Sequence, residues 1–129
     1  MSVPKKILIA EDDPGISELI ETVLEERGYA VEICPDGHVM QELLAGLREN
    51  GFIPDLILLD LWIPGIDGEK MARLLKNNTA TRQIRIVIVS AQRNLQAIVD
   101  RTGADGFLAK PFDIDTLLAV VRQHTGEVV

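Results

Sequence analysis

The sequence predicts an α/β fold in which five parallel strands form a doubly wound sheet with five helices on its two faces. Short continuous apolar runs alternate along the chain with apolar residues at helical spacing, a pattern typical of a parallel sheet covered on both sides. Five strand–helix units are too few for an eight-stranded barrel, so right-handed crossovers favour an open sheet. We therefore expect one domain over residues 1–129, with a core from about residue 6 to residue 124.

The first unit begins with a strand at the apolar residues 7–10, which an acidic cluster follows. Asp13, the last acid of that cluster, can cap a helix that has Pro14 at its first position. Gly28 marks the end of this helix. The apolar residues that recur at helical spacing, and that should face the sheet, are Ile16, Leu19, Ile20, Val23 and Leu24.

The second unit starts with a short strand at residues 30–34 and turns at Pro35-Asp36-Gly37 into a helix. The third strand, residues 56–59, ends on Asp60. Its Pro and Gly content predicts that the next segment, residues 62–68, is a loop. The apolar faces of the two helices in these units are Met40, Leu43, Leu44 and Leu47, and then Met71, Leu74 and Leu75.

The fourth strand covers about residues 84–89 and is followed by Ser90. The helix after it has few apolar markers and ends before Gly103. The fifth strand, residues 106–109, ends at Lys110, and Asp113 then caps the last helix. The apolar faces of these two helices are Leu95, Ile98 and Val99, and then Ile114, Leu117, Leu118 and Val121.

The bulk composition excludes several classes of protein. With 47% hydrophobic and 26% charged residues the chain is globular, and its formal net charge of -7 argues against direct binding to nucleic acid. Cys34 is the single cysteine, so no intrachain disulfide can form. The apolar runs are shorter than the roughly 18 residues of a membrane span, and no leader precedes Lys5. We therefore expect a soluble cytoplasmic protein that does not enter a membrane.

Acids, a hydroxyl and a lysine stand at the ends of four predicted strands, where a doubly wound sheet binds its ligands. Glu11 and Asp12 follow the first strand and Asp60 ends the third, so their carboxylates should converge. Such a cluster is costly without a cation, and its oxygen atoms suit Mg²⁺. The alternative is that the acids cap turns and are solvated.

Asp60 can then act as a nucleophile towards phosphorus, because a rigid strand holds its carboxylate beside the acids that would bind the cation. Lys110 can offer a charge, and Ser90 a hydroxyl, to the oxygens of a phosphoryl group. Each of these residues taken singly is more often a solvated charge or a cap. Their occurrence together at one predicted edge favours the functional interpretation.

The whole chain, from about residue 6 to residue 124, resembles the CheY-like receiver domain of two-component response regulators. Four segments carry the resemblance: residues 7–14, residues 60–68, residues 89–91 and residues 110–112. The resemblance implies a flavodoxin-like fold with strand order 2-1-3-4-5. It also implies a phosphoacceptor signalling domain in a phosphorelay, which assists its own phosphorylation and dephosphorylation but is not a conventional enzyme.

By this resemblance Asp60 accepts a phosphoryl group from the phosphohistidine of a sensor histidine kinase or a phosphotransfer protein. The ion, Mg²⁺ or Mn²⁺, would be held by Glu11, Asp12, Asp60 and the backbone carbonyl of Trp62. Ser90 and Lys110 would contact the phosphoryl group. The bond between Lys110 and Pro111 is a candidate for the cis geometry that proline permits.

The resemblance further identifies Ser90 and Phe107 as switch residues, although a plain core phenylalanine is an equal alternative for Phe107. Trp62 and Gln92 match positions that influence the lifetime of the phosphoryl group. We hypothesise that the large apolar side chain of Trp62 screens the acyl phosphate and slows its hydrolysis.

The output surface implied by the resemblance consists of the fourth helix, the fifth strand and the fifth helix. It would bind a downstream protein, an output domain or a second copy of the chain. The sequence is compatible with a free-standing receiver and with a fragment of a longer regulator or hybrid kinase. The residues expected on this surface are Asp100, Arg101, Asp105, Phe107 and Arg122.

Three alternative functions have weaker support from the sequence. A flavin carrier would need a Ser/Thr/Gly-rich phosphate loop where this chain has acids after its first strand. A magnesium phosphatase would need a second acid close after Asp60, and a scaffold that is never phosphorylated would not need the full acid, hydroxyl and lysine set. His38 and His124 have no metal-ligand spacing and are expected to be structural or surface residues, whereas Met40 and Met71 are expected in the core.

Overall fold

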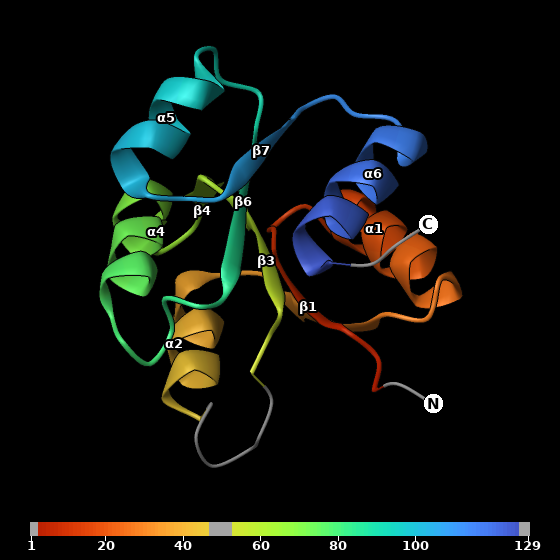
Figure 1. Ribbon diagram of the computed structural model, residues 1–129, viewed down its shortest axis with the longest axis horizontal. Helices are drawn as coiled ribbons and strands as arrows, with labels where there is room; N and C mark the ends of the chain where they lie inside the picture. The colour runs from red at the N-terminus through yellow and green to blue at the C-terminus, as the bar shows by residue number, and fades with distance from the viewer. Residues whose placement is uncertain (1–2, 47–52, 127–129) are drawn as a thin grey trace.

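The computed structural model describes residues 3–46 and 53–126, and its centre is a five-stranded parallel sheet (Figure 1). The strands are β1 (Lys6–Ala10), β2 (Ala30–Cys34), β3 (Leu56–Asp60), β6 (Arg85–Ser90) and β7 (Gly106–Ala109). Their order across the sheet is β2-β1-β3-β6-β7. This is the predicted order 2-1-3-4-5, so the predicted fold class is confirmed.

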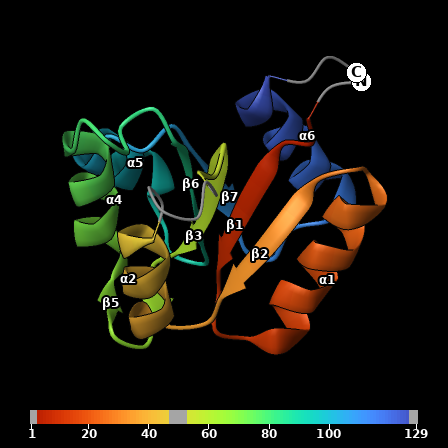
Figure 2. The ribbon, with the colours of Figure 1, turned by 90° about the horizontal axis from the view of Figure 1, so that it is seen from below.

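Within residues 3–46 and 53–126, five helices cover the two faces of the sheet, as predicted. Figure 2 shows α1 (Pro14–Glu26) and α6 (Ile114–Thr125) on one face. It shows α2 (Gly37–Ala45), α4 (Gly68–Asn77) and α5 (Leu95–Thr102) on the other. Such a three-layer arrangement buries the strands on both sides, which is why they read as continuous apolar runs.

Alternate residues of the inner strands belong to two separate hydrophobic cores, one on each face of the sheet. In β1, Ile7 and Ile9 pack with α1 and α6, whereas Leu8 and Ala10 pack with α2, α4 and α5. In β3 all five residues are buried, because this strand lies between β1 and β6 in the middle of the sheet. The predicted core role of Met40 is confirmed, and Met71 is partly buried against the same core.

The predicted helix caps are present. Asp13 Oδ1 accepts a hydrogen bond of 2.8 Å from the N–H of Gly15, and Asp113 Oδ1 accepts one of 2.7 Å from the N–H of Thr116. These bonds satisfy N–H groups that have no acceptor within their own helix. The helix with few apolar markers, α5, ends at Gly103, whose φ of 80° is a left-handed conformation that glycine adopts without strain.

The predicted loop at residues 62–68 is wrong in part. Residues Trp62–Ile63 form strand β4 and residues Ile66–Asp67 form strand β5, and the two pair antiparallel as a small separate sheet. Pro64 and Gly65 make the turn between them, and Gly68 is already the first residue of α4. Pro64 and Gly65 correctly indicate a turn, but the strands on each side of it have only two residues, which is too few to show an alternating pattern in the sequence.

Some residues expected to face the sheet are exposed. Leu74 of α4 is 57% exposed, and Leu19 of α1 and Ile114 of α6 are also exposed. These residues lie at the margins of their apolar stripes, where helical spacing alone does not show how far the contact with the sheet extends. The side chain of Leu43 and all of Leu47 lie outside the described residues.

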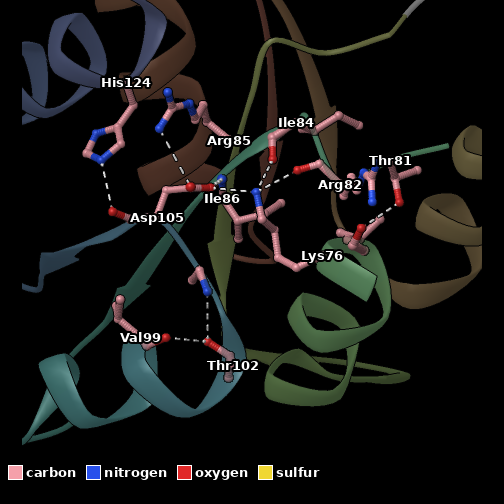
Figure 3. A network of polar contacts seen from close by, with 12 residues as sticks. Lys76, Thr81, Arg82, Ile84, Arg85, Ile86, Val99, Thr102, Asp105 and His124 are labelled. Carbon is pink, nitrogen blue, oxygen red and sulfur yellow. Dashed lines mark hydrogen bonds and ion pairs between the residues drawn. The ribbon is translucent and has the colours of Figure 1, made fainter. Parts of the chain in front are cut away.

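Different side chains gather at the carboxyl ends and at the amino ends of the strands. The carboxyl ends of the strands carry the acids, Ser90 and Lys110 that the sequence singled out. At the opposite edge, where β6 and β7 begin, Lys76 and Asp105 are the centre of a polar network (Figure 3). Within the described residues, no helix is long and apolar enough to cross a membrane.

Candidate functional site

Three carboxylates meet at the carboxyl edge of the sheet. Glu11 directly follows β1 and Asp60 is the last residue of β3, and these strands are neighbours with Ala10 opposite Leu59. Glu11 and Asp60 are buried and Asp12 is exposed. One oxygen from each of the three lies within 4.8 Å of the others, so the predicted convergence is present.

Lys110 lies between two of these acids. Its Nζ donates to Glu11 Oε1 at 2.6 Å and to Asp60 Oδ2 at 2.9 Å. The N–H of Lys110 donates to the carbonyl of Ser90 at 2.9 Å, and the bond from Lys110 to Pro111 is cis. These contacts extend β7 beyond its last paired residue and direct the ammonium into the acid cluster.

The pKa shifts in this cluster reflect burial and an excess of negative charge. Burial raises the pKa of the Glu11 carboxyl; the hydrogen bond from Lys110 opposes this, and the neighbouring Asp60 raises the pKa further. Burial lowers the pKa of the Lys110 ammonium, but hydrogen bonds to Glu11 and Asp60 outweigh burial and leave it above its usual value. Among the described residues, the cluster thus has three carboxylates, and the Lys110 ammonium pairs with two of them, Glu11 and Asp60.

This donor set fits Mg²⁺. The ion prefers hard oxygen ligands and usually takes one or two protein carboxylates together with waters and a phosphate oxygen. Buried Glu11 and Asp60 and exposed Asp12 offer such oxygens, and their mutual repulsion is what a cation would relieve. Mn²⁺ prefers similar ligands.

Ser90 and Gln92 form the other side of the site. Ser90 ends β6 and is buried, and its Oγ accepts a hydrogen bond of 3.1 Å from the N–H of Gln92. Both residues line an open depression of about 390 Å³. The complete lining is Asp60, Trp62, Ser90, Ala91, Gln92 and Lys110.

A depression of about 780 Å³ between α2 and α4 is larger, but Gln41, Asn78, Thr81 and apolar side chains line it. No ionisable side chain is among these described lining residues, so its chemistry does not match that of the acid cluster. The smaller depression is therefore the candidate site.

Trp62 contributes its backbone and its side chain to the site. Its N–H donates to Asp60 Oδ1 at 2.9 Å, while its indole is 72% exposed and lines the depression. Asp60 therefore accepts a hydrogen bond on each carboxylate oxygen, from Trp62 on one and from Lys110 on the other. The carboxylate orientation is set by contacts already present in the folded chain.

Phe107 lies outside this depression. It is in the middle of β7 opposite Ile88, and its side chain is 39% exposed on the sheet's outer strand.

The charged residues expected on the output surface lie on two helices. Asp100 and Arg101 are exposed on α5, where Arg101 forms a two-point ion pair with Glu69 of α4 at 2.7 and 2.9 Å. Arg122 is half-buried on α6.

Asp105 was expected on the output surface, but its carboxylate is bonded within the fold. Its Oδ2 accepts from Lys76 Nζ at 3.0 Å and from the N–H of Ile86 at 2.8 Å. The carboxylate is thus used inside the fold at the amino edge of the sheet. The spacing along the chain places Asp105 near β7 but does not show which way its side chain turns.

The two histidines and the single cysteine lie outside the acid cluster and make contacts within the fold. His38 is exposed and lies 3.0 Å from Glu42 of the same helix. The ring nitrogens of His124 lie 2.9 Å from the Val120 carbonyl oxygen and 3.3 Å from that of Asp105. Cys34 is fully buried, and burial raises the pKa of its thiol to about 11.

The sequence did not reveal the contact between the first turn of α2 and the turn of the β4–β5 hairpin. The N–H of Gly37 donates to the Pro64 carbonyl at 2.8 Å. Both residues belong to segments that were recognisable as turns, Pro35-Asp36-Gly37 and Pro64-Gly65. Their meeting depends on the order of strands in the sheet, which local composition does not encode.

Comparison with known proteins gives one consistent family. The family model of the response regulator receiver domain matches residues 7–122. The DNA-binding dual master transcriptional regulator RpaA of Synechocystis is 39% identical over 119 residues, which are 91% of this chain and 47% of that protein. The response regulator ArlR of Staphylococcus saprophyticus is 40% identical over 117 residues, 91% of this chain and 50% of that protein. The chain thus spans about half the length of these relatives.

Solved structures show the same fold. The signal receiver domain of a response regulator from Bermanella marisrubri has a TM-score of 0.79 at 32% identity, and covers 94% of this chain and 98% of its own. The receiver domain of the sensor histidine kinase PA1611 from Pseudomonas aeruginosa has a TM-score of 0.80 at 27% identity. That comparison covers 97% of this chain and 100% of the other, whose structure has a magnesium ion coordinated in the active site cleft.

Proposed function

Because the chain belongs to the response regulator receiver domain family, we propose that it accepts a phosphoryl group on Asp60 and displays this signal on a protein-binding surface. The donor is the phosphohistidine of a sensor histidine kinase or a phosphotransfer protein. One observation carries the proposal: the Asp60 carboxylate stands at the end of a central strand, beside two other acids and a lysine, in an open depression. Such a carboxylate is rigidly held and accessible to a phosphorus centre.

Glu11, Asp12 and Asp60, with the backbone carbonyl of Trp62, would hold Mg²⁺ or Mn²⁺. When bound, the ion supplies positive charge that reduces repulsion between a carboxylate nucleophile and a phosphoryl group. The proposal is supported by the three carboxylates within 4.8 Å of one another and by the oxygen chemistry that such ions prefer.

In the transfer, an Asp60 oxygen attacks phosphorus, the new P–O bond forms, and the P–N bond to the donor histidine breaks with its electron pair leaving on the imidazole nitrogen. The hydrogen bond from Trp62 N–H holds the carboxylate in one orientation before the donor arrives. Lys110, now paired with Glu11 and Asp60, offers its ammonium to the transferred oxygens, and the hydroxyl of Ser90 is a second donor.

The signal would be displayed on the surface formed by α5, β7 and α6, which are the fourth helix, fifth strand and fifth helix of the sequence prediction. Ser90 and Phe107 are the proposed switch residues, because β6 and β7 pair directly and Phe107 is exposed on that surface. A downstream protein, an output domain or a second copy of the chain would read the change.

The proposal is tested by incubating the protein with acetyl phosphate and Mg²⁺ and measuring its intact mass. The wild type should gain one phosphoryl group and Asp60→Asn none. Asp115→Asn is the matched control, because Asp115 is an exposed aspartate in the first turn of α6, and it should gain the group as the wild type does. A wild type that gains no phosphoryl group from acetyl phosphate or from its cognate kinase would refute the proposal.

A further inference from the structure

We propose that Gly37 is a positioning residue for the reaction at Asp60. It lies in the first turn of α2 and holds the β4–β5 hairpin, which carries Trp62, in place over the site. The inference rests on the proposed function for its effect on phosphoryl chemistry. The placement of the hairpin itself can be measured independently.

A backbone hydrogen bond joins Gly37 to the β4–β5 hairpin. It is the first residue of α2, where an N–H has no acceptor within the helix. This N–H instead donates to the carbonyl of Pro64, at the turn of the hairpin, over 2.8 Å. A donor that the helix leaves unused thus fixes the far end of the hairpin.

The approach of the two turns requires glycine at residue 37. A Cβ at this position would overlap the carbonyl oxygen of Gly65, and it would lie 2.7 Å from both Gly65 C and Ile66 Cγ1. Two of these three atoms are backbone, which cannot rotate away as a side chain can. A side chain at residue 37 must therefore push the hairpin and α2 apart.

The α2 side of this contact is firmly anchored. Asp36, the residue before Gly37, accepts from the N–H of Val39 at 3.0 Å and caps the helix. Its carbonyl accepts from the Sγ of fully buried Cys34 at 3.3 Å, and Cys34 ends β2 in the sheet. Because the sheet and the cap hold this turn, a clash at Gly37 should displace the hairpin more than the helix.

The near end of the hairpin contacts the phosphoacceptor. Trp62 pairs with Asp67 across the hairpin, and its N–H donates to Asp60 Oδ1 at 2.9 Å. Since only Ile63 separates Trp62 from the turn that Gly37 holds, a shift of the turn must move Trp62. The Asp60 carboxylate would then lose its fixed orientation, and the indole would leave its place beside the depression.

The test compares Gly37→Ala with Gly28→Ala. Gly28 has a φ of 91°, so alanine strains the backbone there, but nothing lies within 4 Å of its Cβ position and it is remote from the hairpin at the end of α1. It controls for a general loss of stability, which urea unfolding measures for both variants. Trp62 is the only tryptophan of the chain, so its fluorescence reports on the hairpin alone.

We expect Gly37→Ala to shift the Trp62 emission maximum and to change its quenching by acrylamide. It should also lose its phosphoryl group at least about threefold faster than the wild type, because a displaced indole no longer excludes water from the acyl phosphate. Gly28→Ala should match the wild type in both measurements. Unchanged fluorescence and lifetime in Gly37→Ala, or equal changes in both variants, would overturn the inference.

Amide hydrogen exchange of the wild type tests the contact without any variant. The N–H of Gly37 should be protected and should exchange together with the hairpin amides, as members of one unit that opens cooperatively. Exchange of Gly37 at the rate of an unprotected amide would overturn the inference even if Gly37→Ala failed to fold. If the wild type took up no phosphoryl group, the proposed function would fail, and fluorescence and exchange would still decide whether Gly37 holds the hairpin.

Discussion

Asp60 has both carboxylate oxygens engaged before any donor arrives, one by Trp62 N–H and one by Lys110. In the proposed transfer, a nucleophile held in this way would lose little further freedom when it reacts, which would lower the entropic part of the barrier. Lys110 also contacts Glu11, so moving its ammonium towards an incoming phosphoryl group would leave two acids uncompensated. A cation in the cluster would compensate the negative charge of Glu11 and Asp60 when the Lys110 ammonium moves to the phosphoryl group.

Trp62 leads to a prediction about signal lifetime. Its indole lines the depression beside Asp60 and carries an N–H donor but no hydrogen-bond acceptor, so it cannot take a proton from an attacking water. We expect Trp62→Asn to lose its phosphoryl group faster than the wild type, because the amide can bind water and leaves the acyl phosphate open. The decay is followed by intact mass after removal of the phosphodonor.

The control for this experiment is Leu74→Asn, which also replaces an exposed apolar side chain but lies on α4, outside the depression. It should retain the lifetime of the wild type. A Trp62→Asn variant that decayed no faster than the wild type would remove the screening hypothesis.

Cys34 should be unreactive in the folded protein. It is fully buried, and because burial raises the pKa of its thiol to about 11, only about one thiol in a thousand is ionised at about pH 8. The thiolate is the reactive form, so alkylation by iodoacetamide should be far slower in the native protein than in urea. The native rate should rise as the pH approaches 11, as long as the fold persists. Equal rates in the native and unfolded protein would contradict the assignment.

Among the elements, α4 is joined to the beginning of β6 and β7 by one lysine (Figure 3). Lys76 Nζ donates to the carbonyl of Arg82 at 2.8 Å, to that of Ile84 at 3.0 Å and to Asp105 Oδ2 at 3.0 Å. Arg85 approaches the other Asp105 oxygen at 3.6 Å. Since the side chains of Lys76 and Asp105 are only 16% and 19% exposed, their hydrogen bonds within the protein replace hydration that folding removes.

Replacing Lys76 should therefore destabilise the protein. Lys76→Met keeps the length of the side chain but leaves Asp105 and two carbonyls short of a donor, and we expect a loss of about 2 kcal/mol in the free energy of unfolding. Urea titration measures it. Lys70→Met is the control, because Lys70 is exposed on the same helix, and it should change stability little. Similar values for the two variants would show that the network does not stabilise the fold.

The β4–β5 hairpin and α5 illustrate how elements without strong local signals are held. The hairpin has only two residues in each strand, and its position depends on contacts with Gly37 and Asp60. Helix α5 begins after Asn94 without a side-chain cap, and it is held by Leu95, Ile98 and Val99 in the core and by the pairing of Arg101 with Glu69. Tertiary contact rather than local propensity determines both elements.

For the whole molecule, the site and the amino-edge network occupy opposite ends of the same strands. β7 contains the exposed Phe107 and lies between Asp105, which Lys76 and Arg85 hold, and Lys110 in the acid cluster. A change at Lys110 would therefore act on a strand that is fixed at its other end. For the proposed switch, we therefore expect a local movement around Phe107 rather than a displacement of the entire strand.

Binding of Mg²⁺ should stabilise the whole molecule. An ion that binds the folded but not the unfolded chain adds about 1.4 kcal/mol at about tenfold its dissociation constant. We expect Mg²⁺ to raise the thermal midpoint of the wild type more than NaCl of equal ionic strength does. The rise should be smaller in Asp12→Asn and should persist in Asp115→Asn, since Asp12 is in the acid cluster and Asp115 is not. Equal rises in these variants would show that the cluster is not the binding site.

The sequence was enough to predict the five strand–helix units, the strand order that the family resemblance implies, and the acids, hydroxyl and lysine at the strand ends. It could do so because each apolar run or stripe and each cap is a local pattern, and because parallel strands bring their carboxyl ends to one edge. Ile20 and Leu24 illustrate this, since both were expected in the core and both are buried there.

Four features could be seen only in the folded structure: the β4–β5 hairpin, the contact of Gly37 with Pro64, the inward orientation of the Asp105 side chain and the exposure of Leu74. Each of these depends on contacts between residues far apart in the chain. Gly37 and Pro64 meet because α2 follows β2 while the hairpin follows β3, and the sheet order brings these two connections together. Such proximity is a property of the packed sheet, and no local sequence pattern encodes it.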